Sequence, residues 1–353
     1  MDRQDPMLIE STDSSATVKT INLALQGGGA HGAFTWGVLD RLMEDERVAI
    51  DGISATSAGA MNGAILIHGL QLGGRAGARG LLRQFWRRVA DGARMSPIQP
   101  TLFDRLTGNH NLDHSPVYQA FDLMTRMMSP YQLNPFDYNP LRDILLDLID
   151  FDELRRAAPN KLFVSATNVR SGKIRVFDPS EISAEALLAS ACLPTIHRAV
   201  EIDGEHYWDG GFMGNPAMFP LLYKCQASDI MLVEINPIRI DEVPTTARAI
   251  ADRMNGISFN ATMMREMRTI AFVTRMLDQQ QLLGRTRYRR INFHMIQAER
   301  EMAAFGVSSK LNADWGFLTT LFDLGRVTAD EWLGRNLSAI GNESSVDLQS
   351  LFF

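Results

Sequence analysis

Ser57 is the residue whose surroundings say most about chemistry. It lies in segment 52–63, which passes from an apolar stretch into a helix-like one. Such a segment is typical of a strand, a sharp turn and a helix, where a serine hydroxyl is held at the positive end of the helix dipole. The nucleophile-elbow pattern is G-x-S-x-G, and the residues around Ser57 are Ala55, Thr56, Ala58 and Gly59. We interpret Ser57 as a nucleophile, with helix N-capping as the structural alternative.

A glycine-rich loop precedes Ser57, directly after the first expected strand. Its residues are Gly27, Gly28, Gly29, Ala30, His31 and Gly32. Consecutive glycines at a helix N-terminus let backbone N–H groups converge on an anion, either a phosphate or the oxyanion of an acyl intermediate. The spacing also fits a dinucleotide fingerprint, but no acid ends the second strand to hold a ribose, and no lysine follows Gly32 as a P-loop requires. We favour an oxyanion loop.

A candidate base is Asp209, which follows a short expected strand and precedes Gly210 and Gly211. The two glycines permit a tight turn and leave the carboxylate uncrowded. The structural alternative is a plain turn aspartate.

A Ser-His-Asp triad would need a histidine late in the chain. None of the downstream histidines lies in an obvious catalytic context. We expect His197 and His206 to be solvated beside a hairpin, and we expect His294 to lie in the core or on the surface.

Apolar periodicity predicts the elements that position these residues. Strands are expected at 21–26, 48–55, 161–170, 173–177 and 229–235, helices at 31–46, 58–70 and 184–191, and a hairpin at 199–208. Alternating strands and helices with short turns favour a parallel sheet with right-handed crossovers. The expected fold class is α/β, a three-layer α/β/α arrangement with a mostly parallel sheet, a helical insertion and a helical C-terminal extension.

The expected organisation has three parts. Residues 1–20 form a polar leader, which we expect to be disordered, and residues 21–240 form the catalytic domain. A proline-containing insertion interrupts that domain at about 73–150. Residues 241–353 are mostly helical in pattern, with one weaker strand signal at 290–296.

Composition excludes several classes of function. The 353 residues include 35 lysines and arginines against 41 acids, a formal charge of −6, so nucleic acid is not an expected partner. Cys192 and Cys225 form neither a disulfide framework nor a metal pair, and we expect Cys192 to be buried and inert. With no long apolar run and no signal-peptide pattern, the expected location is cytoplasmic.

Together these residues resemble the patatin-like phospholipase family. The resemblance covers about residues 22–236 and rests on the glycine block 27–32, the serine block 56–59, the segment 189–194 and the acid block 209–211. It implies a Ser-Asp dyad, with Ser57 as nucleophile and Asp209 as general base, and it implies that Gly28 and Gly29 supply the oxyanion N–H groups. Ala55 departs from the pattern within the serine block.

A dyad is chemically reasonable because burial raises the pKa of a carboxyl above its usual value of about 3.9 and makes it a better base. The expected reaction is acyl-ester hydrolysis through an acyl-enzyme, without metal or cofactor, most simply as a phospholipase A or lysophospholipase. Alternatives are another ester hydrolase or acyltransferase on the same scaffold, such as an intracellular polyester depolymerase, and a non-catalytic scaffold protein.

A lipid ester as substrate partner motivates a hypothesis of peripheral membrane contact. The insertion carries apolar candidates at Met95, Leu102, Phe103, Phe121, Leu123, Met124, Met127, Met128 and Tyr131. A packed helical cap explains them too, and the two interpretations are compatible. A basic run could contact anionic lipid, or could be a solvated face: Arg285, Arg287, Arg289 and Arg290.

Overall fold

The computed structural model describes residues 18–279 and 289–352. Its centre is an eight-stranded sheet with the order β5-β6-β3-β2-β1-β7-β8, and β4 pairs with β3 beside this path. The strands are β1 Lys19–Leu25, β2 Val48–Ala55, β3 Lys161–Asn168, β4 Ile174–Phe177, β5 Val200–Ile202, β6 Glu205–Asp209, β7 Asp229–Val233 and β8 Asn292–Ile296.

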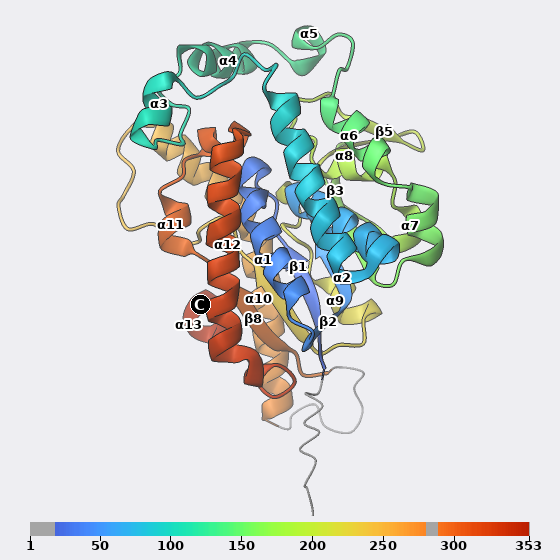
Figure 1. Cartoon of the computed structure of the whole chain (residues 1–353). Helices are drawn as coiled ribbons and strands as arrows, with labels where there is room; N and C mark the ends of the chain where they lie inside the picture. The colour runs from blue at the N-terminus through green and yellow to red at the C-terminus, as the bar shows by residue number, and fades with distance from the viewer. Residues whose placement is uncertain (1–17, 280–288, 353) are drawn as a thin grey trace, which may run out of the picture.

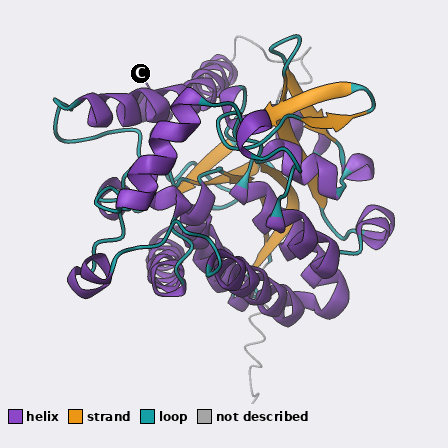
Figure 2. Ribbon diagram, turned by 90° about the horizontal axis from the view of Figure 1, so that it is seen from above, coloured by secondary structure: helices purple, strands orange, loops and turns teal. Residues whose placement is uncertain are grey.

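Helices cover both faces of this sheet (Figures 1 and 2). The larger helices are α1 Gly32–Glu44, α2 Ala58–Ala93, α4 Pro116–Met127, α6 Pro140–Leu148, α8 Ala184–Ser190, α10 Ala247–Asp278 and α12 Trp315–Asn336. Shorter ones are α3 Leu102–Thr107, α5 Pro130–Leu133, α7 Phe151–Ala157, α9 Phe219–Lys224, α11 Glu299–Ala303 and α13 Leu348–Phe352. Single 3-10 turns are η1 Gly29–His31, η2 Pro179–Glu181, η3 Gly210–Phe212, η4 Val307–Leu311 and η5 Leu337–Ala339.

The sheet is parallel in its centre and antiparallel at one edge. β1 pairs in parallel with β2 and β7, β2 with β3, and β7 with β8. β3 runs antiparallel to β4 and β6, and β5 and β6 form a hairpin. Apolar residues on both faces of the central strands are buried, as a parallel sheet between helical layers requires. The predicted fold class, central strands and hairpin are confirmed.

Two separate apolar clusters form the core, one on each face of the sheet. The larger joins the sheet to α1, α2, α8 and α12, and the smaller joins it to α9 and α10. No helix within residues 18–279 and 289–352 combines the length and the apolar character that crossing a bilayer needs.

One expected boundary is wrong. β1 begins at Lys19, inside the expected leader, and residues 1–17 of that leader lie outside the described residues. The helix expected at 58–70 is confirmed: α2 is interrupted at Gly73 and Gly74, whose backbone angles are not helical, and a second helical run continues from there to Ala93. The second half packs because its apolar residues keep a helical spacing and are buried at Leu82, Phe85 and Trp86. The insertion therefore leaves the core only after Ala93.

The C-terminal region 241–353 contributes directly to the core. β8 extends the sheet beyond β7, which confirms the weaker strand signal at 290–296. α12 packs along α1, and the ring of Trp36 on α1 lies 4.1 Å from the ring of Phe322 on α12. The sheet and the helical layer over it are therefore incomplete without this region.

Close contact between α1 and α12 depends on two reciprocal glycines. A Cβ at Gly37 would overlap the carbonyl oxygen of Phe322, and a Cβ at Gly325 would overlap the carbonyl oxygen of Phe34. The two backbones therefore touch, and any side chain at either position forces the helices apart.

We expect Gly325→Ala to lower the free energy of unfolding by about 1–3 kcal/mol, because the clash outweighs the better helix propensity of alanine. The matched control is Gly334→Ala on the same helix, where a Cβ meets nothing within 4 Å. That variant should be stabilised by roughly 0.5–1 kcal/mol. Denaturant unfolding followed by circular dichroism measures both, and equal shifts in the two variants would contradict the backbone contact.

Candidate active site

Ser57 occupies a strained turn between β2 and α2. Its φ is 54° and its ψ −124°, a conformation that is costly for a residue with a side chain. Two hydrogen bonds hold the turn: the Ser57 N–H donates to Ser190 Oγ at 2.8 Å, and the Thr56 hydroxyl donates to the Gly214 carbonyl at 2.7 Å. The Ser57 side chain does not cap α2, so the capping alternative is wrong.

Small residues around Ser57 are required by close packing. A Cβ at Gly27 would lie 2.6 Å from the Cβ of Ser57, too close for any side chain to fit. A Cβ at Gly59 would overlap the Leu25 carbonyl at the end of β1. The glycine loop and the first turn of α2 can therefore approach each other only through bare backbone.

Strand register brings Asp209 to the level of Ser57. Ala55 in β2 pairs with Val164 in β3, and Ala166 in β3 pairs with Asp209 in β6. Ser57, two residues beyond Ala55, therefore lies level with Asp209. Asp209 is held there by its own N–H, which donates to the Cys192 carbonyl at 2.8 Å.

Asp209 is 2% exposed, and its carboxyl lies close enough to the Ser57 hydroxyl for that hydroxyl to lower its pKa. Its Oδ1 accepts the Gly211 N–H at 2.7 Å. Burial raises the Asp209 pKa to about 7, while the Gly211 N–H, the Ser57 hydroxyl and the charge of Lys310 each lower it. The carboxyl is therefore poised to exchange a proton near neutral pH.

The N–H groups of the glycine loop are not all available to an oxyanion. Gly27 donates to Asn215 Oδ1 at 2.7 Å, His31 donates to the Gly28 carbonyl at 3.2 Å, and the Gly32 N–H bonds within its own turn. Local turns and Asn215 therefore use the N–H groups of these three residues, which belong to the expected oxyanion loop. Within the described part of the chain, no acceptor contacts the N–H of Gly28 or Gly29.

His31 connects the glycine loop to Ser309 in η4. It is 2% exposed, and its Nε2 lies 2.7 Å from Ser309 Oγ, which itself donates to the Gly306 carbonyl at 2.7 Å. His31 is therefore the donor to Ser309. Burial, aided by Lys310, lowers the His31 pKa to about 3 and keeps the ring neutral. This residue ties η1 to η4.

The downstream histidines lie in three different environments. His294 is fully buried in β8 and contacts Asp229 at 3.0 Å, which confirms the core alternative. His206 is 36% exposed near Glu201, as expected. For His197 the expected solvation is wrong: it lines a cavity beside Ser57, burial lowers its pKa, and the carboxylate whose charge opposes this is Asp137 rather than Asp209.

Cys192 is buried, and burial raises its thiol pKa to about 12. Cys192 is therefore buried, as expected. Its raised pKa keeps it in the thiol form, which is unreactive because the thiolate is the nucleophile.

Two cavities meet at Ser57. One, of about 440 Å³, is mostly apolar and is lined by Ala30, Ala58, Met61, Phe85, Trp86, Val89 and Ile144. The other, of about 490 Å³, carries polar and charged groups from α4, α10 and η4: Tyr118, Asp122, Arg126, Arg248, Asp252 and Lys310. Ser57 and Gly29 line both cavities. The serine thus stands between an apolar compartment and a charged one.

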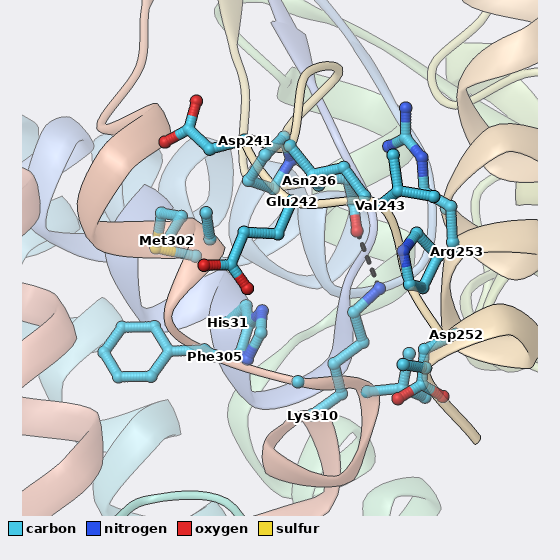
Figure 3. Close-up of a pocket in the computed structure, with 18 of the residues that line it drawn as sticks. His31, Asn236, Asp241, Glu242, Val243, Asp252, Arg253, Met302, Phe305 and Lys310 are labelled. Atoms are coloured by element: carbon cyan, nitrogen blue, oxygen red, sulfur yellow. Dashed lines mark hydrogen bonds between the residues drawn. The ribbon is translucent and has the colours of Figure 1, made fainter. Parts of the chain in front are cut away.

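A third cavity, of about 630 Å³, lies behind the glycine loop and does not reach Ser57. Figure 3 shows Lys310 on its wall, with the amino group directed at Asn236. Lys310 lines all three cavities.

A family model described as patatin-like phospholipase matches residues 23–222. The chain belongs to the patatin-like phospholipase family. A search of curated proteins found no significant match.

Similar solved structures are distant. VipD from Legionella pneumophila is 14% identical, with 86% of this chain and 66% of that chain covered, just under two thirds of its length, at a TM-score of 0.37. A complex of ExoU with SpcU from the type III secretion system of Pseudomonas aeruginosa gives 16% identity, 95% and 74% coverage, and a TM-score of 0.29. At such scores neither carries an argument here.

Sequence reasoning missed three polar residues of this patatin-like site. Asn215 holds Gly27, Asn236 donates to the Gly27 carbonyl at 2.7 Å, and Lys310 enters all three cavities. Asn215 follows the acid block by a few residues and could have been suspected. Lys310 carries no local signal, because nothing in its own segment indicates contact with the glycine loop.

Proposed function

We propose that this protein hydrolyses acyl esters of phospholipids, as a phospholipase A or lysophospholipase, with a Ser57–Asp209 dyad. The observation that supports this most directly is that Ser57, on a strained turn, lies level with the buried Asp209 and its hydroxyl lowers the pKa of that carboxyl. A serine needs such a partner because its hydroxyl is a weak nucleophile until a base accepts its proton.

The reaction proceeds in two halves. Ser57 Oγ attacks the ester carbonyl carbon while Asp209 accepts the hydroxyl proton, and the N–H groups of Gly28 and Gly29 receive the developing oxyanion. Collapse of the intermediate expels the alcohol, which takes the proton from Asp209, and leaves an acyl-serine. Water then attacks the acyl group with Asp209 again as base, and the released Ser57 regains its proton.

The raised pKa of Asp209 suits this role. A carboxylate of ordinary pKa is too weak a base for a hydroxyl, whereas a group with a pKa near 7 is both ionised and basic at neutral pH. Each oxyanion donor contributes by binding charge that develops only in the transition state, and the loss of one such donor typically costs about 10²–10³ in rate.

The two cavities support a phospholipid substrate over a polyester. The apolar cavity accommodates an acyl chain, and the charged cavity carries the cationic side chains of Arg126, Arg248 and Lys310 where a phosphate headgroup would lie. Arg126 pairs with Asp122 and Arg248 with Asp113, so their charges are partly balanced at rest. A polyester has no phosphate group that could bind these cationic side chains in place of their aspartate partners.

Apolar side chains of the insertion are exposed at the end of the molecule where α3, α4 and α5 lie (Figure 1). The most exposed are Met95, Phe103, Leu106, Met127, Phe136 and Tyr138. Phe121 on α4 lines both cavities at Ser57, so this face is continuous with the site. We therefore propose that it contacts the membrane. The side chain of Leu102, another of the expected apolar candidates, lies outside the described residues.

The structure describes two residues of the basic run, Arg289 and Arg290. Arg285 and Arg287 lie outside the described residues. The Arg289 guanidinium donates to the carbonyls of Gln226 and Leu221, so it serves the protein's own backbone.

We expect Ser57→Ala and Asp209→Asn each to lower kcat/KM for lysophospholipid hydrolysis by roughly 10³-fold or more, because each removes half of the dyad. His206→Ala is the control and should retain activity. Wild-type rates on phospholipid, lysophospholipid, triglyceride and polyhydroxyalkanoate test the substrate class. Full activity in Asp209→Asn would refute the base, and a preference for polyhydroxyalkanoate would refute the phospholipid.

Filling the apolar cavity should select against long acyl chains. Gly92 lies six residues, about 9 Å, along the helix from Trp86, and a Cβ there would approach Ile144 Cδ1 at 3.9 Å. We expect Gly92→Phe to slow the hydrolysis of long-chain esters at least tenfold more than that of short-chain esters. Each methylene group that is kept out of the cavity loses about 0.8 kcal/mol of burial free energy. Gly80→Phe, on the same helix in open space, is the control. Equal slowing of long-chain and short-chain esters would show that the acyl chain does not bind in this cavity.

The catalytically inactive Ser57→Ala protein should co-sediment with phospholipid vesicles. Adding Phe103→Glu and Met127→Glu should reduce the bound fraction severalfold, because both side chains are exposed on the proposed face. Tyr223→Glu, at an exposed position on α9, is the control. Absence of pelleting even at low salt would rule out this contact.

A further inference from the structure

Lys310 lies against the glycine loop although it comes from a distant part of the chain. A Cβ at Gly29 would overlap the Lys310 carbonyl, so the two backbones are in direct contact. The Lys310 ammonium donates to Asn236 Oδ1 at 2.7 Å, as Figure 3 shows. Asn236 in turn donates to the Gly27 carbonyl at 2.7 Å. Backbone and side chain of Lys310 are thus both fixed to the loop beside Ser57.

The segment that carries Lys310 is itself anchored. Ser309 accepts a hydrogen bond from His31 and donates to the Gly306 carbonyl. His31 is neutral, so it positions η4 without adding a second positive charge. The fold therefore holds the Lys310 ammonium at a defined place beside the glycine loop.

We propose that Lys310 is a positioning residue whose ammonium charge keeps the buried Asp209 carboxylate ionised, and so ready to accept the Ser57 proton. This inference rests on the proposed dyad. Lys310 takes no part in proton transfer. It acts through Asp209, because an opposite charge nearby stabilises the carboxylate that burial disfavours.

The electrostatics of the two groups agree with this role. Burial raises the Asp209 pKa to about 7 even though the Lys310 charge acts to lower it. Burial lowers the Lys310 pKa to about 8, and Asp209 opposes that change. Between about pH 7 and 8 both groups are therefore charged. Without the cation, only the Gly211 N–H and the Ser57 hydroxyl oppose burial, so the Asp209 pKa rises further and more of the base is protonated at neutral pH.

Other charged groups face Lys310 from the elements around it. Asp252 on α10 also raises the Lys310 pKa, and burial raises the pKa of Asp252 itself. The remaining charges of the polar cavity and the cavity behind the loop are Asp122, Arg126, Asp241, Glu242, Arg248 and Arg253. Among the groups that the structure describes, Lys310 is the cation whose charge lowers the Asp209 pKa.

The test is the pH dependence of Ser57 labelling by an uncharged fluorophosphonate, measured beside hydrolysis of an uncharged short-chain ester. Neither probe carries a headgroup, so anion binding by Lys310 does not enter. Two neutral variants are compared: Lys310→Met, and Lys310→Gln, whose amide can still donate to Asn236. In both, the midpoint of the acid limb should move up by roughly one pH unit or more, with the high-pH plateau kept within a few-fold. Lys310→Arg should return the midpoint close to that of wild type.

Lys173→Met, an exposed lysine on the β3–β4 turn, controls for loss of a positive charge and should leave the midpoint unchanged. The Asp252→Asn variant should keep the acid limb of the pH profile. If the acid limb disappeared in this variant, it would belong to the titration of Asp252, and the inference would be overturned. An unchanged midpoint in a neutral variant with native circular dichroism, or equal loss at every pH, would also overturn it. Failure of wild type to label or hydrolyse would instead overturn the dyad, so the two failures are distinct.

Discussion

Burial of one carboxyl group is the constraint around which this site is built. At 2% exposure Asp209 loses most of its hydration, which would make the ionised form costly without compensation. The Gly211 N–H, the Ser57 hydroxyl and the Lys310 charge supply that compensation only in part, so the pKa settles near 7. A fully compensated carboxylate would be too weak a base, and an uncompensated one would be neutral.

The sheet supplies the geometry for this balance. β2 and β6 lie on opposite sides of β3, and their register puts the elbow and the acid at one level. The Ser57 turn is strained, and it persists because Thr56 and Ser190 hold it from both sides. The glycine loop completes the site from β1, close enough to the serine that only glycine fits at residue 27.

The region after residue 240 is structurally part of the same site. β8 extends the sheet, α12 packs on α1 through glycine-to-backbone contact, and η4 meets the glycine loop through His31 and Lys310. α10 contributes Arg248 and Asp252 to the charged cavity. The family match ends at residue 222, so these contributions are features of this chain beyond the matched segment.

Local sequence determined the elements and the reactive residue types. Buried parallel strands are continuous apolar runs, and glycine-rich turns follow them, so β1, β2, β3, β7 and the two blocks at 27–32 and 209–211 could be predicted from short windows. The glycines at 73 and 74 do interrupt α2, but the second helical run up to Ala93 was not predicted, because only the folded core shows that Phe85 and Trp86 are buried.

Tertiary structure alone decided which groups could act. Gly27 and Gly28 look alike in sequence, yet Asn215 occupies the N–H of the first, because only the folded chain brings that amide near. Lys310 is one of five lysines in the sequence, and its own segment does not distinguish it until η4 packs against η1. Its charge and the pKa of Asp209 follow from distance and desolvation, and both of these are properties of the packed molecule that no local sequence pattern encodes.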